Sequence, residues 1–136
     1  MADLPSALTA TTSVVGAVAS AAAWDGGEGW LRTTLARLEA NRDLVFGVLR
    51  ERVPVLTGRP PEGTYMAWLQ ASGTLAASGD PRGVLLREAG VDLAEGKPFG
   101  DESGARVRMS FACPQATLEE ALDAIAVACE RLSDYA

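Results

Sequence analysis

The chain has no histidine among its 136 residues, and it has a single lysine. The absence of histidine excludes Ser-His-Asp triads, histidine general bases and nearly all zinc-hydrolase sites. The lone lysine, Lys97, lies in a loop between two glycines. A Schiff base needs an amine with a lowered pKa, and the neighbouring sequence offers neither burial nor a second cation that would lower it. We therefore interpret Lys97 as a solvated loop residue.

Cysteine, clustered positive charge and long apolar runs are also scarce. Cys113 and Cys129 are too few for a disulfide framework, and we expect both to be small core residues. A net charge of −6 with scattered arginines argues against a nucleic-acid surface. The apolar stretch 8–23 follows no basic segment and is too short and too polar to span a membrane. These absences predict a cytoplasmic protein without nucleic-acid or membrane partners.

Hydrophobic spacing predicts two long helices and a buried N-terminal one. Residues 13–23 are small and apolar with little polar face, which is typical of a helix buried on all sides, yet no partner for it is obvious in this chain. Residues 25–27 break it, and residues 30–52 form a helix that Pro54 stops. A capping box at residues 117–120 opens the last helix. The core faces of the two long helices carry Leu31, Leu35, Leu38, Val45 and Leu49, and then Leu118, Leu122, Ile125, Cys129 and Leu132.

A small sheet is expected between these helices. Three strands are predicted, at residues 64–69, 91–93 and 106–112, and the first should be covered on both faces because it shows no clean alternation. Loops are predicted at 58–63, 71–79 and 96–100. Asp80, Pro81 and Gly90 have the positions of an N-cap, a first helical residue and a C-terminal stop. The sum is an α+β domain in which a long helix leads into a sheet of about three or four strands, covered by helices.

Arg108 is the strongest candidate for a functional residue. In the strand at 106–112, Val107, Met109 and Phe111 alternate with Arg106, Arg108 and Ser110. An arginine in mid-strand is costly to bury without a partner, and its planar fork suits a carboxylate. Spacing alone favours a structural ion pair with a nearby Asp or Glu over a ligand site.

The order of several segments adds a resemblance to a known family. Residues 61–69 and 107–114 are similar to two strand motifs of the fold-type-I pyridoxal-phosphate (PLP) enzymes, in the cystathionine β-lyase and aminotransferase group known as the MalY/PatB type. Further similar segments cover nearly the whole chain, at residues 22–24, 30–31, 39–43, 85–91, 96–100 and 118–122. Residues 22–24 and 30–31 count as one segment, and seven segments in the order and spacing of the family are more specific than any one of them.

The resemblance implies the C-terminal part of a two-domain enzyme. Residues 1–25 would be the end of an incomplete large PLP domain, and residues 26–136 the small domain with its long interdomain helix. The lysine that binds PLP would lie upstream of Met1, so no catalytic residue is expected here and the chain alone should be inactive. Arg108 matches the arginine that binds the substrate α-carboxylate, and Tyr65 would line the same pocket. The implied partners are an amino-acid substrate and either a second copy in a homodimer or the missing large domain.

The resemblance leaves the reaction open between C-S β-elimination and transamination, because both begin from the same carbanion with PLP as the electron sink. It also leaves other readings open. The chain could be half of a split enzyme, or a non-catalytic binding or dimerisation module in which Arg108 is structural. A third alternative makes Met1 an internal start, in which case the apolar segment 13–23 would be exposed and prone to aggregation.

Overall fold

The structure, a computed structural model, describes residues 13–134 of the chain. The chain divides into two compact units, one ending at Ala36 and the other comprising Arg37–Ala136. Within the described residues, no helix combines the length and the apolar character needed to cross a membrane.

The first unit contains helix α2 (Val14–Gly26) and the start of helix α3 (Glu28–Arg52). Ser13 caps α2 by accepting a hydrogen bond from the Gly16 amide, and the helix ends at the predicted glycine pair. None of the α2 residues is buried, so the expected burial is wrong for this chain. A helix that is apolar all round is buried only where other elements surround it. Leu31 and Leu35, which the spacing placed on a core face, are likewise exposed.

The second unit is built on a four-stranded antiparallel sheet with the order β1-β2-β4-β3. Its strands are β1 (Leu56–Gly58), β2 (Met66–Ala71), β3 (Ala94–Glu95) and β4 (Arg106–Ser110). β4 lies where the alternation predicts it. β1 occupies residues 56–58, partly in a predicted loop, and β2 begins two residues later than expected. The prediction of a strand at 91–93 is wrong, because β3 begins only after it, at Ala94.

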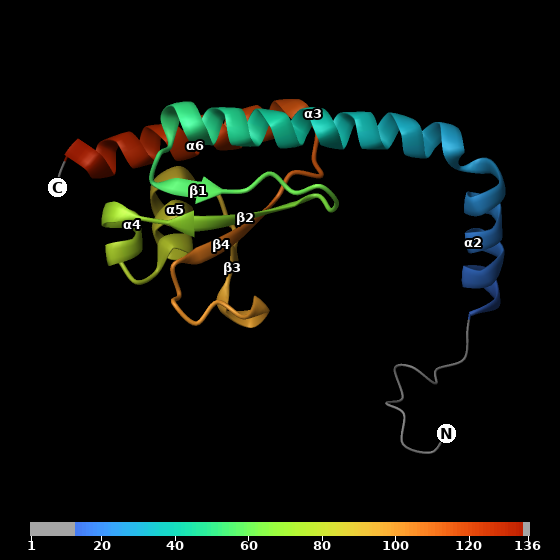
Figure 1. The fold of residues 1–136 in the computed structure, drawn as a ribbon, viewed down its shortest axis with the longest axis horizontal. Coiled ribbons are helices and arrows are strands. Elements are labelled where there is room, and N and C mark those ends of the chain that lie inside the picture. The colour runs from blue at the N-terminus through green and yellow to red at the C-terminus, as the bar shows by residue number, and fades with distance from the viewer. Residues whose placement is uncertain (1–12, 135–136) are drawn as a thin grey trace, which may run out of the picture. The chain divides into compact units, whose positions relative to one another are not determined.

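One face of the sheet packs into the core. β2 alternates between buried and half-buried residues, so the prediction that both of its faces are covered is wrong. Its buried residues, Ala67, Leu69 and Ala71, share the core with Val107, Met109 and Phe111. Val45 and Leu49 of α3 belong to the same core, together with residues of α6 (Gln115–Asp134). Figure 1 shows α6 and this part of α3 on one side of the sheet, which leaves the other side for a site.

The remaining helices follow local signals to different degrees. Helix α5 (Pro81–Ala89) has the predicted caps, because Asp80 accepts a hydrogen bond from the Gly83 amide and Gly90 adopts a left-handed φ of 68°. Helix α4 (Gly73–Ala77) lies in a predicted loop. Helix α6 begins two residues before Thr117, so the predicted capping box is wrong; the Pro114 carbonyl instead accepts from the Leu118 amide. The predicted core face of α6 is confirmed by buried Leu118, Leu122, Ile125 and Cys129.

Asn41 joins α3 to the end of β4. Its side chain is buried, and its Nδ2 donates to the carbonyl oxygens of Phe111 at 2.8 Å and of Cys113 at 2.9 Å. Both carbonyls lie in the segment that leaves β4 and enters α6. A buried carbonyl without a donor costs free energy, so one amide here stabilises two acceptors.

We expect Asn41→Ala to lower the free energy of unfolding by about 1–3 kcal/mol, because it leaves these acceptors without their donor. Urea unfolding followed by circular dichroism measures the change. Glu51→Ala, at an exposed position on the same helix, is the control and should shift stability by no more than about 0.5 kcal/mol. An Asn41→Ala protein as stable as this control would show that the two hydrogen bonds do not hold α3 in place.

Candidate functional site

Arg108 lies at the centre of the sheet, on the face turned away from the core. In the register it pairs with Trp68 of β2 on one side and with Ala94 of β3 on the other. Directly paired residues of antiparallel strands project to the same face. Val107 and Met109 are buried while Arg108 is half-buried, so the guanidinium belongs to the outer face, as the alternation predicted.

Phe99 completes a small cluster with Trp68 and Arg108, referred to below as the Arg108 cluster. Phe99 is the last residue of the short 3-10 helix η1 (Lys97–Phe99). The Arg108 Cζ lies 3.7 Å from the centroid of the Phe99 ring. The Trp68 ring meets Phe99 edge to face, with centroids 6.4 Å apart and planes at 89°. This geometry combines a cation–π contact with a favoured aromatic pair.

Between residues 13 and 134, the Arg108 guanidinium forms no ion pair with a carboxylate. Arg106, two residues away on the same strand, does have an acidic neighbour, with its Nη1 3.8 Å from Asp101 Oδ1. The structural ion pair that spacing alone favoured for Arg108 therefore has no partner in this part of the chain. Arg108 also lines a cavity of about 250 Å³ that includes Met66, Ser110, apolar residues around Leu93, and Asp92, whose carboxylate pairs with Arg82.

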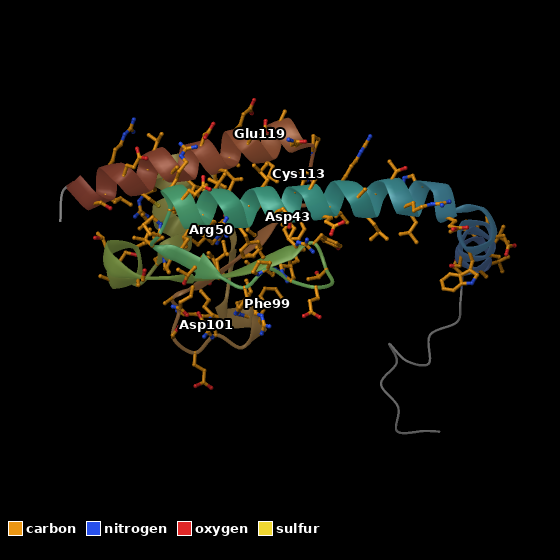
Figure 2. The ribbon with its side chains drawn as sticks, turned by 45° about the horizontal axis from the view of Figure 1, so that its top comes forward. Asp43, Arg50, Phe99, Asp101, Cys113 and Glu119 are labelled. Atoms are coloured by element: carbon orange, nitrogen blue, oxygen red, sulfur yellow. The ribbon has the colours of Figure 1, made fainter. Side chains whose placement is uncertain are left out.

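The loop from η1 to β4 is held by Asp101, a buried acid that the sequence did not single out. Its carboxylate accepts from the Ser103 hydroxyl at 2.6 Å, the Ser103 amide at 3.1 Å and the Arg106 amide at 2.8 Å. The hydrogen bond from Ser103, followed by those from the two amides and the nearby Arg106 charge, lowers the pKa of Asp101 below its ordinary value. Figure 2 shows Phe99 and Asp101 together on the side of the sheet away from α6.

Gly96 allows this loop to close onto β4. A side chain at this position would place its Cβ 2.8 Å from the Arg106 carbonyl oxygen and 2.9 Å from the Asp101 Cβ. The Gly96 amide donates to that same carbonyl at 2.9 Å, and the Gly96 carbonyl accepts from the amides of Phe99 and Asp101. The loop that carries Phe99 is therefore tied directly to the strand that carries Arg108.

Tyr65 lies just before β2, three residues from Trp68, and its side chain is 46% exposed. Its carbonyl accepts from the Phe111 amide at 2.9 Å, which continues the β2–β4 pairing by one step. The preceding Thr64 has a φ of 79°, a left-handed value that is rare for a β-branched residue. The structure thus brings Arg108 together with Trp68 and Phe99, and leaves Tyr65 one residue before the start of β2.

The other residues considered from the sequence lie apart from the Arg108 cluster or in the core. Lys97 is exposed on η1. Cys129 is buried, which raises the pKa of its thiol, and Cys113 is half-buried against the core. Among residues 13–134 there is no group of three His, Cys, Asp or Glu side chains that could hold a metal ion. The described residues therefore include one exposed amine and no buried one with which an aldehyde cofactor could form a Schiff base.

The stabilising effect of Asp101 should depend on pH in a defined direction. Because its folded pKa is lowered, the carboxylate contributes stability above the ordinary aspartate pKa of about 3.9, and this contribution is lost as the pH falls toward the lower folded value. We expect Asp101→Asn to be less stable than the parent protein at pH 7, with a difference that shrinks below about pH 4. Urea unfolding at a series of pH values measures it.

The matched control for this prediction is Glu102→Gln, which removes the neighbouring exposed carboxylate. It should follow the parent protein over the same pH range. A pH-independent difference between the parent and Asp101→Asn would assign the effect to lost shape complementarity instead of to the ionised carboxylate.

The chain is similar in sequence to several known enzymes. No family model matches the chain. It is 34% identical over 114 residues to a cystathionine beta-lyase of Corynebacterium glutamicum, which covers 84% of this chain and 30% of that protein. It is 34% identical over 143 residues to an aspartate aminotransferase of Rhizobium meliloti, which covers 98% of this chain and 34% of that protein.

The fold agrees with these sequence matches. The PLP-bound C-S lyase from Staphylococcus hominis, in complex with L-cycloserine, superposes with a TM-score of 0.79 at 24% identity, covering 90% of this chain and 33% of that one. The chain thus spans about a third of the length of the curated relatives that it matches. The chain is therefore similar in sequence to proteins named cystathionine beta-lyase, MalY, PatB and aspartate aminotransferase, and similar in fold to a PLP-bound C-S lyase, over about one third of their length.

Proposed function

We propose that this chain is the C-terminal, substrate-binding part of a PLP-dependent C-S β-lyase or aminotransferase, and that Arg108 binds the α-carboxylate of an amino-acid substrate. The observation that carries the proposal is the environment of the Arg108 side chain. It is half-buried in mid-strand, stacked on Phe99, and without an acidic partner between residues 13 and 134. The relatives supply the reaction class, since they include both cystathionine β-lyases and aspartate aminotransferases.

The physical basis of this role is the shape of the guanidinium. Its two N–H edges can donate two parallel hydrogen bonds to the two oxygens of a carboxylate, which fixes orientation as well as charge. The Phe99 ring occupies a face of the guanidinium and leaves these edges for a ligand. A carboxylate held in this way orients the bonds at the substrate α-carbon, and orientation of reacting groups is a large part of catalysis.

Tyr65 is proposed as a second residue of the same substrate pocket. Its phenol is partly exposed, and its backbone is fixed by the hydrogen bond from Phe111 and by the left-handed Thr64. A phenol can donate to a substrate oxygen or accept from a substrate amine.

We propose that the cofactor is bound by residues outside this chain's described part. Lys97 is exposed, and the other cations of the chain are arginines, which do not form Schiff bases. When bound, PLP would supply the electron sink for the substrate carbanion. On this proposal, residues 1–25 belong to the end of a large PLP domain and residues 26–136 form the small domain.

The exposed apolar side chains of the first unit support the proposal that a further domain or chain covers them. Its exposed apolar side chains include Val14, Val15, Val18, Trp24, Trp30, Leu31 and Leu35. An exposed apolar set of this size marks an interaction surface or an aggregation site. The large domain of the same protein, a separate chain in a split enzyme, or a second copy in a homodimer would each bury part of it.

A non-catalytic binding or dimerisation module is the alternative function, and Arg108→Ala separates the two. In protein that carries the large domain, we expect this variant to weaken binding of an amino-acid substrate by about tenfold to a hundredfold while the protein remains folded, because a charge-assisted hydrogen-bonding partner is lost. Isothermal titration and urea unfolding provide the two readouts.

Arg106→Ala is the matched control, since Arg106 lies on the same strand and face but next to Asp101. It should bind substrate within about twofold of the parent protein, because it contributes no donor to the ligand. Loss of folding in Arg108→Ala, or unchanged binding, would favour the module over the enzyme.

The isolated chain supplemented with PLP should not turn over cystathionine, and a lysine-bearing large domain added in trans or in cis should be required for activity. Turnover by the isolated chain would contradict the proposed division of roles. An immunoblot against this region shows which form the cell uses: a band much larger than 14.2 kDa indicates one continuous enzyme, and a band at 14.2 kDa indicates a split enzyme or a binding module.

A further inference from the structure

The Phe99 ring, which covers a face of the Arg108 guanidinium, is itself exposed. Its side chain is 51% exposed, although an aromatic ring of this size normally contributes to a core. One edge contact joins it to Trp68, and the guanidinium of Arg108 lies over its face at 3.7 Å from the centroid. The ring therefore contributes little to the core and contacts the residue proposed to bind substrate.

The backbone around Phe99 fixes where this ring lies. The Phe99 amide donates to the Gly96 carbonyl at 2.9 Å, and Gly100 follows with a left-handed φ of 91°. Asp101 then anchors the loop to the Arg106 amide at 2.8 Å. The loop that carries Phe99 is thus held by hydrogen bonds to β4, the strand that carries Arg108.

Ala94 explains how the ring gains access to the guanidinium. It is the β3 residue paired with Arg108 on the outer face, and its methyl group leaves space beside the arginine. Trp68 lies on the opposite flank of Arg108, in the paired position on β2. The arginine therefore lies in a row with a large aromatic residue on one side and a small residue on the other, and Phe99 makes the ring contact with its guanidinium.

We propose that Phe99 is a positioning residue for Arg108: its ring holds the plane of the guanidinium so that the N–H edges are oriented for a carboxylate before the ligand arrives. This inference rests on the proposed carboxylate-binding role of Arg108. A free arginine side chain has many rotamers, and binding a ligand costs the entropy of selecting one. A cation–π contact that selects the rotamer in advance reduces this cost, and the apolar ring also shields one face of the guanidinium from water.

The first experiment tests the stack itself. In the chain labelled with ¹⁵N-arginine, the Nε–Hε resonance of Arg108, assigned by its loss in Arg108→Lys, should be shifted upfield because the guanidinium lies over an aromatic face. Phe99→Leu should remove this shift, and Phe99→Tyr should retain it. A resonance at the random-coil position in the parent protein would overturn the proposal, whether or not the variants fold.

The second experiment tests positioning, with acetate as the probe and the same resonance as the readout. We expect Phe99→Leu to weaken acetate binding by about threefold to thirtyfold, the range of a cation–π contact. Phe99→Tyr should bind acetate as tightly as the parent protein does. If both variants have equal urea midpoints, a role of Phe99 in loop stability alone would not explain the difference in acetate affinity between them. Equal acetate affinity in Phe99→Leu and the parent protein would contradict the inference.

A third variant, Arg108→Ala, shows whether a negative result disproves only the positioning role of Phe99 or also the proposed role of Arg108. Acetate binding to this variant is followed through the amide resonances of neighbouring residues. If acetate binding disappears in Arg108→Ala but not in Phe99→Leu, Arg108 binds the carboxylate without help from Phe99, and only the inference is wrong. If Arg108→Ala binds acetate as well as the parent protein does, the proposed role of Arg108 is wrong, and the positioning role is lost with it.

Discussion

The antiparallel pairing of β2 with β4 is the constraint on which the rest of the second unit depends. It places Ala67 opposite Met109 and Leu69 opposite Val107, so that both strands present apolar side chains to α3 and α6. The same register places Trp68 beside Arg108 on the other face. Because side chains alternate along a strand, a slip of one residue would send the arginine into the core and a core residue into solvent. The register that forms the core is therefore the same register that places Arg108 on the outer face of the sheet.

The fold could be predicted from the sequence where local chemistry determines it. Asp80, Pro81 and Gly90 delimit α5 because caps act within a turn, and the alternation of residues 106–110 identifies β4 because one face must be apolar. The three-residue β1 and the five-residue α4 were missed because such short elements have almost no period of their own and form through tertiary contacts.

The sequence identified one residue of the candidate site, Arg108, but not the residues that surround it. Arg108 stands out because a charge interrupts an apolar strand, and the family resemblance gives it a role. The contact with Phe99 could not be read from spacing, since it depends on the path of a loop that the buried Asp101 fixes through three hydrogen bonds. Burial of an acid depends on the whole fold, and a single aspartate in a polar loop carries no local sign of it. The burial expected for residues 13–23 failed for a related reason: composition identifies a helix suited to an apolar environment but not the residues that would supply it.

The amide of Asn41 has a mechanical consequence. It fastens α3 to the backbone at Phe111 and Cys113, at the exit of β4, and Arg108 lies only three residues before the first of these points. A strand is stiff along its length, so a displacement of α3 near Asn41 would pull on β4 and carry the arginine with it. The part of α3 beside the sheet is thereby attached to β4 close to Arg108, and the two hydrogen bonds determine how closely helix and strand move together.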